Sequence, residues 1–426
     1  MSNNILLTKK GRSVNGTVNL TGSKSECNRA LIIEALSEGK VTVQNVSDAA
    51  DTVTLAGILK SKGKSLNSKV LAGDEADTLT EVNIGPAGTA MRFLTAYFTL
   101  QDEEVILTGT ERMKQRPIGI LVNALRQLGA VIDYVENDGF PPIKIKGNLQ
   151  QTTDTITIKG DISSQYITAL LLIAARLPLG LNLNIEGELT SRPYVEMTLA
   201  MLEQADIKHS WTDNTISIAH QEFKETALPV EPDWSAASYW YAIAALADEA
   251  EIFLKGLTAY SLQGDSVITE IMANFGITSQ FKDGGVYLKK ENKPISRDLF
   301  DMKKCPDLAQ TVIVVCAALG HEATFTGLET LKIKETDRVK ALQNELAKMG
   351  VKLIEDNLMY KLDCSEKFIP QRLFVNTYED HRMAMAFAPL ALLIPEVELE
   401  EEKVVEKSYP AFWSDLEQLG FIAKSI

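Results

Sequence analysis

Two charged clusters in the second half of the chain contain the residue types needed for acid–base chemistry on an anionic substrate. They are Lys334-Glu335-Thr336-Asp337-Arg338 and Asp380-His381-Arg382. A helical pattern of apolar residues follows each cluster, so both should lie where a helix begins. The unpaired N–H groups and positive dipole end of a helix N-terminus suit an anion. Two cations beside one carboxylate therefore predict an anion site with a proton donor or acceptor in reach.

The local patterns predict how each cluster is positioned. Alternating apolar residues from Leu331 onward indicate the end of a strand, and a helical pattern then runs from Val339 to Gly350. After the second cluster a helix is expected from Met383 to Leu393. Charges in a first helical turn are often only capping groups. Here the same arrangement recurs along the chain, which favours a binding function.

Composition narrows the classes of partner. A chain of 426 residues predicts two or three domains. The formal net charge of −14 argues against nucleic acid or an anionic membrane surface as a partner. The longest apolar run, Met383 to Pro395, is too short to span a bilayer. Four cysteines without a CxxC pair predict the reduced thiols of a cytoplasmic protein, and no His/Cys set has zinc spacing.

The chain repeats itself at intervals of roughly 70 residues, a spacing longer than that of most solenoid repeats. Each copy has an alternating strand ending in Gly, a loop, an amphipathic helix and two further strands. Four copies align well, namely Val105 through Lys146, Leu183 through Ala219, Ile252 through Lys290 and Ala323 through Leu362; Val41 to Leu71 is a weaker copy. A second, more apolar helix precedes each copy, and these helices should begin near Lys24, Gly88, Ser163, Trp234, Asp307 and Asp380.

Six such units predict two similar α/β domains, each of three βαβαββ-type units with buried parallel helices. Ser164 to Leu177 and Asp307 to Leu319 are apolar almost all round, as buried helices are. The unit beginning near Glu396 is cut short by the C-terminus, and an N-terminal hairpin from Ile5 to Leu20 is expected to supply its missing strands. One domain should therefore comprise residues 1–21 and 232–426, and the other residues 22–231.

The predicted helix mouths and the loops between units bring together groups that bind oxyanions. The planar guanidinium of Arg can donate two parallel hydrogen bonds to a phosphate or carboxylate, and Lys adds a positive charge on a flexible side chain. The cations concerned are Lys24, Arg29, Arg116, Lys334, Arg338, Arg382 and Lys407. Asp307 and Glu335 are the carboxylates best placed for proton transfer. The sequence thus predicts a site for two small anionic substrates between two domains.

Other catalytic motifs do not fit. Gly22-Ser23-Lys24-Ser25 lacks the first glycine of a Walker loop at the required distance. No GxGxxG motif follows a strand, and no GxSxG elbow occurs.

The motifs resemble the enolpyruvyl transferases over the whole chain, and specifically the 5-enolpyruvylshikimate-3-phosphate synthase family. The resemblance is most specific in Ala87-Gly88-Thr89-Ala90-Met91-Arg92, in Arg112-Met113-Lys114-Gln115-Arg116-Pro117 and in the two clusters described first. It implies an inside-out α/β barrel fold of two domains that close on the substrates. It also implies that phosphoenolpyruvate donates its enolpyruvyl (carboxyvinyl) group to the 5-hydroxyl of shikimate 3-phosphate, releasing phosphate, in chorismate and aromatic amino acid biosynthesis. No metal or organic cofactor is implied, and a monomer is expected.

The resemblance also implies ligand sets. Those for phosphoenolpyruvate are Lys24, Gly88, Arg116, Gln165, Arg338, Arg382 and Lys407. Those for shikimate 3-phosphate are Lys24, Ser25, Arg29, Ser163, Ser164, Gln165, Ser191, Tyr194, Asp307 and Lys334. The domain built from both termini would hold mainly residues for phosphoenolpyruvate, and the other domain most of those for shikimate 3-phosphate.

The reaction needs two proton-transfer roles. Protonation of C3 of phosphoenolpyruvate makes C2 electrophilic, the hydroxyl adds and loses its proton, and the adduct then eliminates phosphate. Glu335 is assigned to the C3 proton, Asp307 to the hydroxyl proton and Lys24 to charge stabilisation. Asp307 could instead serve mainly as a hydrogen-bond acceptor for the ring hydroxyls.

Two alternatives compete with this hypothesis. A UDP-N-acetylglucosamine enolpyruvyl transferase shares the fold, but that family has a reactive Cys in the loop matching Glu111 to Pro117, where this chain has none. A non-catalytic anion-binding repeat protein would not need Asp307 and Glu335 beside the cations. The chain departs from the family pattern at Pro86, where Asn is usual, and at Thr330, where some members have Asn.

Overall fold

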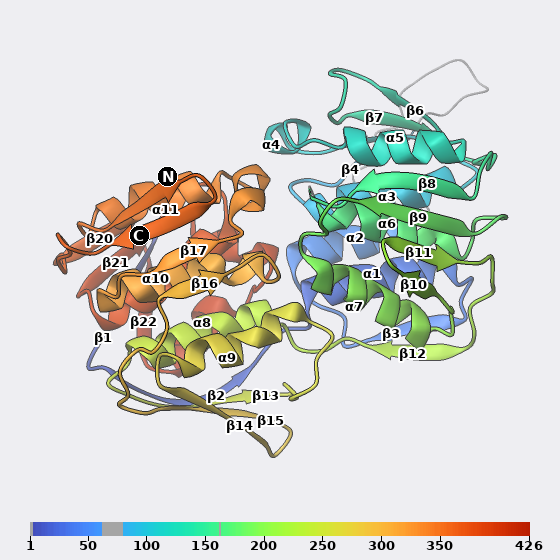
Figure 1. Cartoon of the computed structure of the whole chain (residues 1–426). Helices are drawn as coiled ribbons and strands as arrows, with labels where there is room; N and C mark the ends of the chain where they lie inside the picture. The colour runs from blue at the N-terminus through green and yellow to red at the C-terminus, as the bar shows by residue number, and fades with distance from the viewer. Residues whose placement is uncertain (1–2, 62–79, 162) are drawn as a thin grey trace. The chain divides into compact units, whose positions relative to one another are not determined.

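The computed structural model describes residues 3–61, 80–161 and 163–426, in which helices and strands alternate along the chain (Figure 1). The chain divides into two compact units. Unit 1 consists of Met1–Ser23, Asp48–Ala50 and Glu231–Ile426, and unit 2 of Lys24–Ser47 and Asp51–Val230. The sequence-based domain boundaries followed residues 21 and 231, and they did not separate Asp48–Ala50 from its neighbours. The expected weak copy from Val41 to Leu71 lies partly outside the described residues.

Unit 2 surrounds its helices with three sheets in the part of the chain that is described. Their strand orders are β4-β5-β7-β6, β8-β9-β11-β10 and β12-β3. The strands are β3 (Val41–Gln44), β4 (Thr80–Asn83), β5 (Glu104–Thr108), β6 (Val131–Tyr134), β7 (Ile143–Lys146), β8 (Thr155–Lys159), β9 (Leu181–Glu186), β10 (Ser210–Thr212), β11 (Thr215–Ile218) and β12 (Thr226–Pro229). The helices are α1 (Lys24–Leu36), α2 (Ala50–Lys60), α3 (Gly88–Thr99), α4 (Glu111–Lys114), α5 (Gly119–Leu128), α6 (Ser164–Ala174) and α7 (Arg192–Gln204).

Unit 1 has the same plan, with sheets ordered β2-β13-β15-β14, β16-β17-β19-β18 and β20-β21-β1-β22. The strands are β1 (Ile5–Lys9), β2 (Ser13–Asn19), β13 (Glu249–Lys255), β14 (Ile277–Lys282), β15 (Gly285–Lys290), β16 (Leu299–Asp301), β17 (Thr324–Thr326), β18 (Lys352–Asp356), β19 (Met359–Asp363), β20 (Arg372–Val375), β21 (Glu396–Leu399) and β22 (Phe421–Ser425). The α-helices are α8 (Trp234–Leu246), α9 (Ile268–Ala273), α10 (Ala309–Leu319), α11 (Arg338–Ala347), α12 (His381–Phe387) and α13 (Phe412–Gln418). The 3₁₀ turns are η1 (Gly264–Val267), η2 (Pro306–Leu308), η3 (Glu329–Ile333), η4 (Ala388–Leu392) and η5 (Glu402–Lys407).

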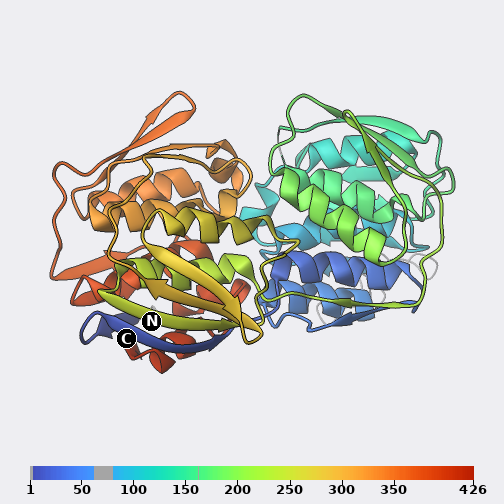
Figure 2. The same ribbon diagram turned by 60° about the horizontal axis from the view of Figure 1, so that its bottom comes forward.

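The repeat predicted from the sequence is visible in the strand pairing. In each four-stranded sheet an edge strand runs parallel to the second strand, and two antiparallel strands complete the sheet, as in β16, β17, β19 and β18. Helices α3, α6, α8 and α10 are buried almost all round and lie inside the sheets (Figures 1 and 2), where α6 packs against α3 and α7, and α10 against α8 and α12. All residues of α6 except Gln165 are buried. The predicted α/β fold with buried helices is therefore confirmed.

The predicted N-terminal hairpin is wrong. Strand β1 lies between β21 and β22 and pairs antiparallel with both, whereas β2 pairs in parallel with β13 in a different sheet. The C-terminal segment supplies its own outer strand, β22, so only one position in that sheet remained for the N-terminus. One strand from each end of the chain thus completes the last repeat of unit 1.

Where the chain passes from one unit to the other, a strand and the helix that follows it belong to different units. Strand β2 precedes α1 in the sequence, yet it pairs with β13 in unit 1. Strand β12 precedes α8, yet it pairs with β3 in unit 2. Each unit therefore completes its own sheets although the chain enters and leaves unit 2 in the middle of a repeat.

Two local predictions near the charged clusters are also corrected. The expected strand at Leu331 is the 3₁₀ turn η3, in which Leu331 is buried while Ile333 is 43% exposed. A strand would have placed both side chains on one face. The helix expected from Met383 to Leu393 is α-helical only to Phe387 and continues as η4. Pro389 has no N–H for the i→i−4 hydrogen bond, so an α-helix cannot continue regularly through it.

Candidate active site

In unit 1, Arg338 is surrounded by three carboxylates. Its Nε lies 2.7 Å from Asp380 Oδ2, its Nη1 3.2 Å from Asp307 Oδ1, and its Nη2 2.9 Å from Glu335 Oε2. The side chain is only 2% exposed. Burial by itself would lower the pKa of Arg338, but Asp380, Glu335 and Asp307 outweigh it and raise that pKa. Arg338 is therefore a permanent, rigidly held cation at the start of α11.

Arg382 is a second buried cation that shares Asp307 with Arg338. Its Nη2 lies 2.9 Å from Asp307 Oδ2, and its Nη1 donates to Tyr239 Oη at 3.3 Å. Burial opposes ionisation of Asp307, but Arg382, Lys334 and Arg338 more than compensate and bring the pKa of Asp307 well below its usual range. Asp307 is thus an ionised carboxylate clamped between cations.

Glu335 and the two lysines complete this cluster. Lys407, at the end of η5, places its Nζ 3.1 Å from Glu335 Oε1, and Lys334 Nζ lies 3.6 Å from Asp307 Oδ1. The Glu335 side chain is 13% exposed, so solvent and ligands reach it. The structure therefore brings together all six site residues predicted in unit 1, namely Asp307, Lys334, Glu335, Arg338, Arg382 and Lys407.

In unit 2, Gly88 and Arg116 lie in direct contact. A Cβ atom built on Gly88 would come within 2.5 Å of Arg116 Nη1 and 2.8 Å of its Nη2. Arg92 fixes the segment that leads to Arg116, because its Nη2 donates to the Pro117 carbonyl at 3.0 Å and its Nη1 to the Gly88 carbonyl at 3.1 Å. The guanidinium of Arg116 thus lies against the first residue of α3, at a helix N-terminus. The structure places Pro86 before the N-cap Ala87, not in the first helical turn.

The remaining predicted residues of unit 2 lie at the starts of α1, α6 and α7. Lys24 Nζ lies 3.1 Å from Asp51 Oδ2, and Gln165 Nε2 donates to Thr89 Oγ1 at 3.3 Å. Ser163 is the N-cap of α6, where its hydroxyl accepts from the Gln165 N–H, and Ser164 follows as the first helical residue. Ser191 precedes α7 in a left-handed conformation with φ of 54°.

Arg29 has a different environment from the other cations. Its Nε donates to Thr198 Oγ1 at 2.9 Å, and its Nη atoms donate to the carbonyls of Ser25 at 2.6 Å and Tyr194 at 3.3 Å. Burial lowers the pKa of Arg29 to about 10. These contacts link α1 to α7 and hold the backbone of Ser25 and Tyr194, both of which were predicted as ligands.

Four residues that position the predicted ligands were absent from the predicted set. Asp380 orients Arg338 and caps α12, Asp51 holds Lys24, Arg92 holds the Arg116 segment, and Ser235 links Arg382 to Asp265. Asp380 had a sequence signal, because it stands two residues before Arg382 at a helix mouth. Asp51 had none, since its pairing with Lys24 depends on how α2 packs.

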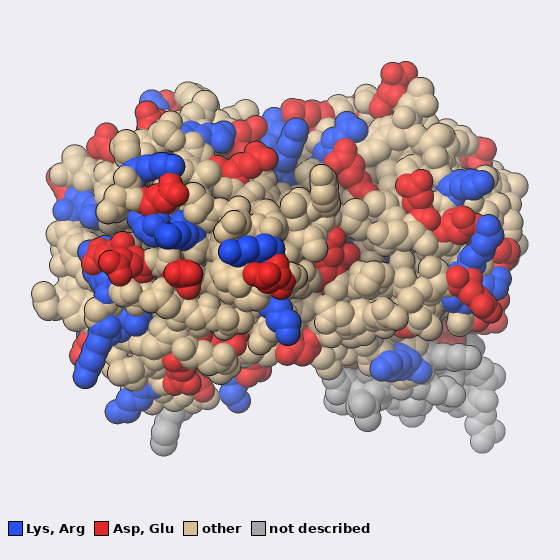
Figure 3. Space-filling view, turned by 90° about the horizontal axis from the view of Figure 1, so that it is seen from below, with Lys and Arg blue, Asp and Glu red and all other residues tan. Residues whose placement is uncertain are grey.

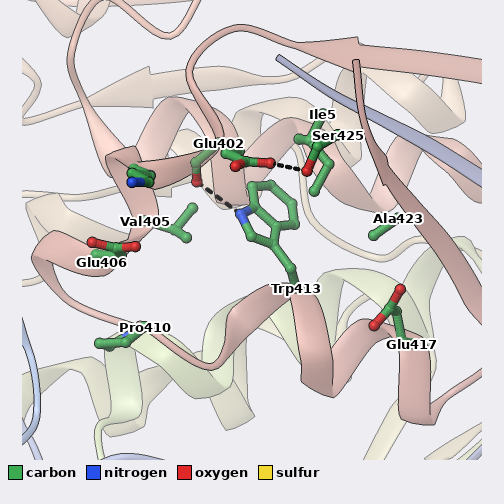
Figure 4. Close-up of a pocket in the computed structure, with 10 residues that line it drawn as sticks. Ile5, Glu402, Val405, Glu406, Pro410, Trp413, Glu417, Ala423 and Ser425 are labelled. Carbon is green, nitrogen blue, oxygen red and sulfur yellow. Dashed lines mark hydrogen bonds between the residues drawn. The ribbon is translucent and has the colours of Figure 1, made fainter. Parts of the chain in front are cut away.

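The pocket in Figure 4 is a separate feature of unit 1. Trp413 and Val405 line it together with Glu402, whose carbonyl accepts a hydrogen bond from Trp413 Nε1 at 2.8 Å. None of the predicted site residues lines this pocket. This pocket is therefore distinct from the charged clusters of the predicted site.

Lys and Arg are interspersed with Asp and Glu on the face in Figure 3. Within the described ranges, no three His, Cys, Asp or Glu residues are grouped to hold a metal ion. In the same residues, no helix has the length and apolar character needed to cross a membrane. The four cysteines are free thiols.

This fold is that of the enolpyruvyl transferases. A solved structure of EPSP synthase from Acinetobacter baumannii matches with a TM-score of 0.74 and 19% identity, covering 99% of this chain and 100% of that one. The enolpyruvyl transferase NikO from Streptomyces tendae matches with a TM-score of 0.73 and 15% identity, covering 100% and 99%. At these identities the likeness shows the fold alone.

Sequence comparison identifies the family. The family described as EPSP synthase (3-phosphoshikimate 1-carboxyvinyltransferase) matches residues 8–416. A 3-phosphoshikimate 1-carboxyvinyltransferase from Bacteroides fragilis (strain YCH46) is 46% identical over 410 residues, 96% of each chain. One from Shewanella piezotolerans is 35% identical over 420 residues, 96% of this chain and 97% of that one. The chain belongs to the EPSP synthase family.

Proposed function

We propose that the protein transfers the enolpyruvyl group of phosphoenolpyruvate to the 5-hydroxyl of shikimate 3-phosphate, with Asp307 and Glu335 as its proton-transfer groups. Family membership supports the substrates, the reaction and its place in the shikimate pathway. The observation that carries the residue assignment is the cluster in which Asp307 and Glu335 are ion-paired to four cations.

Cations of both units serve as ligands in this proposal. Phosphoenolpyruvate is bound by Lys24, Gly88, Arg116, Gln165, Arg338, Arg382 and Lys407, and shikimate 3-phosphate by Lys24, Ser25, Arg29, Ser163, Ser164, Gln165, Ser191, Tyr194, Asp307 and Lys334. Two observations support the ligand set for phosphoenolpyruvate. Gly88 packs against Arg116, and carboxylates hold Arg338 and Arg382 in place. The Ser163 cap and the Arg29 links support the set for shikimate 3-phosphate.

The ion pairs imply how substrate binding prepares the carboxylates. Arg338 and Arg382 pair with Asp307, and Arg338 and Lys407 pair with Glu335. The phosphate and carboxylate of phosphoenolpyruvate compete for the same cations. When a cation turns to the substrate, burial raises the pKa of the carboxyl group left behind. A carboxylate whose cation has turned to the substrate thereby becomes a better proton acceptor.

The proton steps then follow. Glu335 in its acid form gives a proton to C3 of phosphoenolpyruvate, and the 5-hydroxyl oxygen adds to C2 while Asp307 accepts its proton. Glu335 recovers the C3 proton as the C2–O bond to phosphate breaks, and the proton held by Asp307 passes to the leaving phosphate, which returns both carboxyl groups to their starting states. The surrounding cations stabilise the adduct electrostatically, and Lys24 stabilises charge on the leaving phosphate. In the ground state Asp307 also accepts hydrogen bonds from the ring hydroxyls.

Phosphate release tests this function. Phosphate should appear only when phosphoenolpyruvate and shikimate 3-phosphate are both present, and treatment with a chelator should leave the rate unchanged. UDP-N-acetylglucosamine offered as the acceptor should give no phosphate. Release with that acceptor alone would assign the chain to the other transferase reaction, and no release with either would favour a non-catalytic anion binder.

We also propose that the protein is a monomer that acts in the cytoplasm. The four free thiols support a reducing compartment. Light scattering at several concentrations tests the first point, since a mass near 46.9 kDa is expected throughout.

A further inference from the structure

Two consecutive residues just before Asp380 adopt a left-handed backbone conformation. Tyr378 has φ of 55° and Glu379 has φ of 57°. Non-glycine side chains rarely adopt this conformation, and it costs free energy unless the surroundings hold it in place. Backbone strain of this kind clusters at active sites. The next residue, Asp380, orients Arg338 through its carboxylate and caps α12 at Arg382.

A fully buried glutamate holds this strained turn. Glu345 has 0% exposure, and its Oε1 accepts hydrogen bonds from Tyr378 Oη at 2.7 Å and Asn376 Nδ2 at 3.2 Å. Its Oε2 accepts from the Asn376 N–H at 3.1 Å and from Lys348 Nζ at 2.6 Å. Asn344 Nδ2 contacts Tyr378 Oη at 3.3 Å. A buried carboxylate with four donors is well satisfied, so it is a firm anchor.

Glu345 and Arg338 lie seven residues apart on α11, which is two helical turns. Both side chains therefore project from one face of the helix. The segment from Asn376 to Asp380 is attached to that face at two points, by Glu345 near its start and by Arg338 at its end. The left-handed turn at Tyr378 and Glu379 lies between these attachments.

We propose that Glu345 and Tyr378 are positioning residues for the reaction. They hold the left-handed turn against α11 and so set Asp380, which in turn orients the guanidinium of Arg338 and the start of α12 with Arg382. Neither residue contacts substrate in this scheme. The inference rests on the proposed function only in that Arg338 and Arg382 are taken as the cations that bind phosphoenolpyruvate.

The sharpest test is Glu379→Gly, because positioning and simple structural support predict different outcomes. Glycine adopts positive φ without strain, so the melting temperature should stay the same or rise. The turn would lose the constraint that fixes the position of the Asp380 carboxylate. Because misplacement by about 1 Å can cost about 10²-fold in rate, kcat/KM for phosphoenolpyruvate should fall by about ten- to a hundredfold. The KM for shikimate 3-phosphate should change less.

Glu38→Gly is the matched control. Glu38 is an exposed glutamate in the same conformation, with φ of 55°, and it lies beyond the C-terminal end of α1. Its substitution also removes an exposed ion pair with Arg176, so the comparison is made on kcat/KM, which should stay unchanged. Two further variants test the anchor: Tyr378→Phe removes one hydrogen bond, and Glu345→Gln replaces the carboxylate with a group of the same shape. Both should lower kcat/KM for phosphoenolpyruvate more than they raise the KM for shikimate 3-phosphate.

A binding measurement separates this inference from the proposed function. An apparent affinity for inorganic phosphate is obtained from the phosphate concentration at which the rise in melting temperature is half-maximal. This affinity reports the geometry of the cations even if the wild type has no activity. In Glu379→Gly the half-maximal phosphate concentration should rise about tenfold or more, a change of ~1.4 kcal/mol. If Glu379→Gly, Tyr378→Phe and Glu345→Gln all retain wild-type kcat/KM and phosphate affinity, the turn does not position the cations. An inactive wild type in which phosphate affinity still falls in Glu379→Gly would contradict the proposed function alone.

Discussion

Gly88 and Arg116 are packed so closely that the Arg116 guanidinium occupies the space where any other residue at position 88 would place its Cβ atom. The nearest nitrogen lies 2.5 Å from that position, and the guanidinium carbon lies 2.9 Å from it. A real Cβ atom essentially never comes this close, so a side chain at 88 requires the guanidinium to move. Glycine is therefore needed at position 88 because the Arg116 guanidinium occupies the space beside it, and not because of its backbone conformation.

Gly88→Ala should displace Arg116 and weaken phosphoenolpyruvate binding. Because a methyl group shifts the guanidinium without removing its charge, KM for phosphoenolpyruvate should rise roughly tenfold, about 1.4 kcal/mol, while KM for shikimate 3-phosphate changes little. Initial-rate kinetics with each substrate varied in turn measure both values. Gly57→Ala is the control, since Gly57 lies in α2 and no atom of the described residues lies within 4 Å of an added Cβ. Equal effects of the two substitutions would show that Arg116 is not held by Gly88.

Pro86→Asn should tighten phosphoenolpyruvate binding only modestly, by tenfold or less. Proline offers no donor, and one hydrogen bond to a charged group is worth ~1.5–3 kcal/mol, part of which is offset by desolvating the new amide. Arg116→Ala should have the larger effect, in the opposite direction, because it removes a buried charge. Titration of phosphoenolpyruvate with shikimate 3-phosphate saturating ranks the two variants. A larger shift for Pro86→Asn would make position 86 a main determinant of affinity.

Glu335→Gln should lower turnover much more than it raises either KM. The amide cannot donate and recover the C3 proton, and general acid–base groups contribute ~10²–10⁴-fold. Glu329→Gln is the matched control, because Glu329 is an exposed glutamate in the neighbouring turn η3. Phosphate release under saturating conditions measures kcat for both. Near-normal turnover of Glu335→Gln would transfer the proton role to another group, with Lys24 as the next candidate.

Asp265→Asn should stabilise the protein at neutral pH and do so less as the pH falls. Burial and the neighbouring Asp307 carboxylate raise the pKa of Asp265 to about 6. A carboxyl group with a raised folded-state pKa contributes stability that is present below its unfolded pKa and is lost as the pH rises through the folded value. The wild type therefore carries a penalty at pH 7 that is absent near pH 4, on the order of 2–3 kcal/mol at most.

Melting temperatures of Asp265→Asn and wild type between pH 4 and pH 7 test this. The difference should grow over that range and level off above it. Asp133→Asn, at an exposed position of β6, controls for the loss of a carboxyl group as such. A difference for Asp265→Asn that is independent of pH would mean that this carboxyl group does not titrate with a raised pKa.

Local sequence patterns were sufficient to predict the repeat, the buried helices and most of the charged residues. The starts of α1, α3 and α8 match the predicted positions because apolar periodicity and capping chemistry act within a few residues. Residues at such helix mouths, including Lys24, Gly88 and Arg382, could be named from the chain alone. The reaction and its substrates came from the motifs as a set.

Pairing between distant segments was decided by the tertiary structure. Nothing local indicates that β1 inserts between β21 and β22 while β2 joins β13, because strand pairing depends on which sheet has an open position. The same holds for Asp51 beside Lys24 and for Glu345 beneath Tyr378, which lie 27 and 33 residues apart in the chain. Hydrogen bonds and ion pairs act over about 3 Å in space, so the partners of a charged side chain follow from packing and not from neighbouring residues. The sequence determined which groups are available for chemistry, and only the fold decided which carboxylate holds which cation.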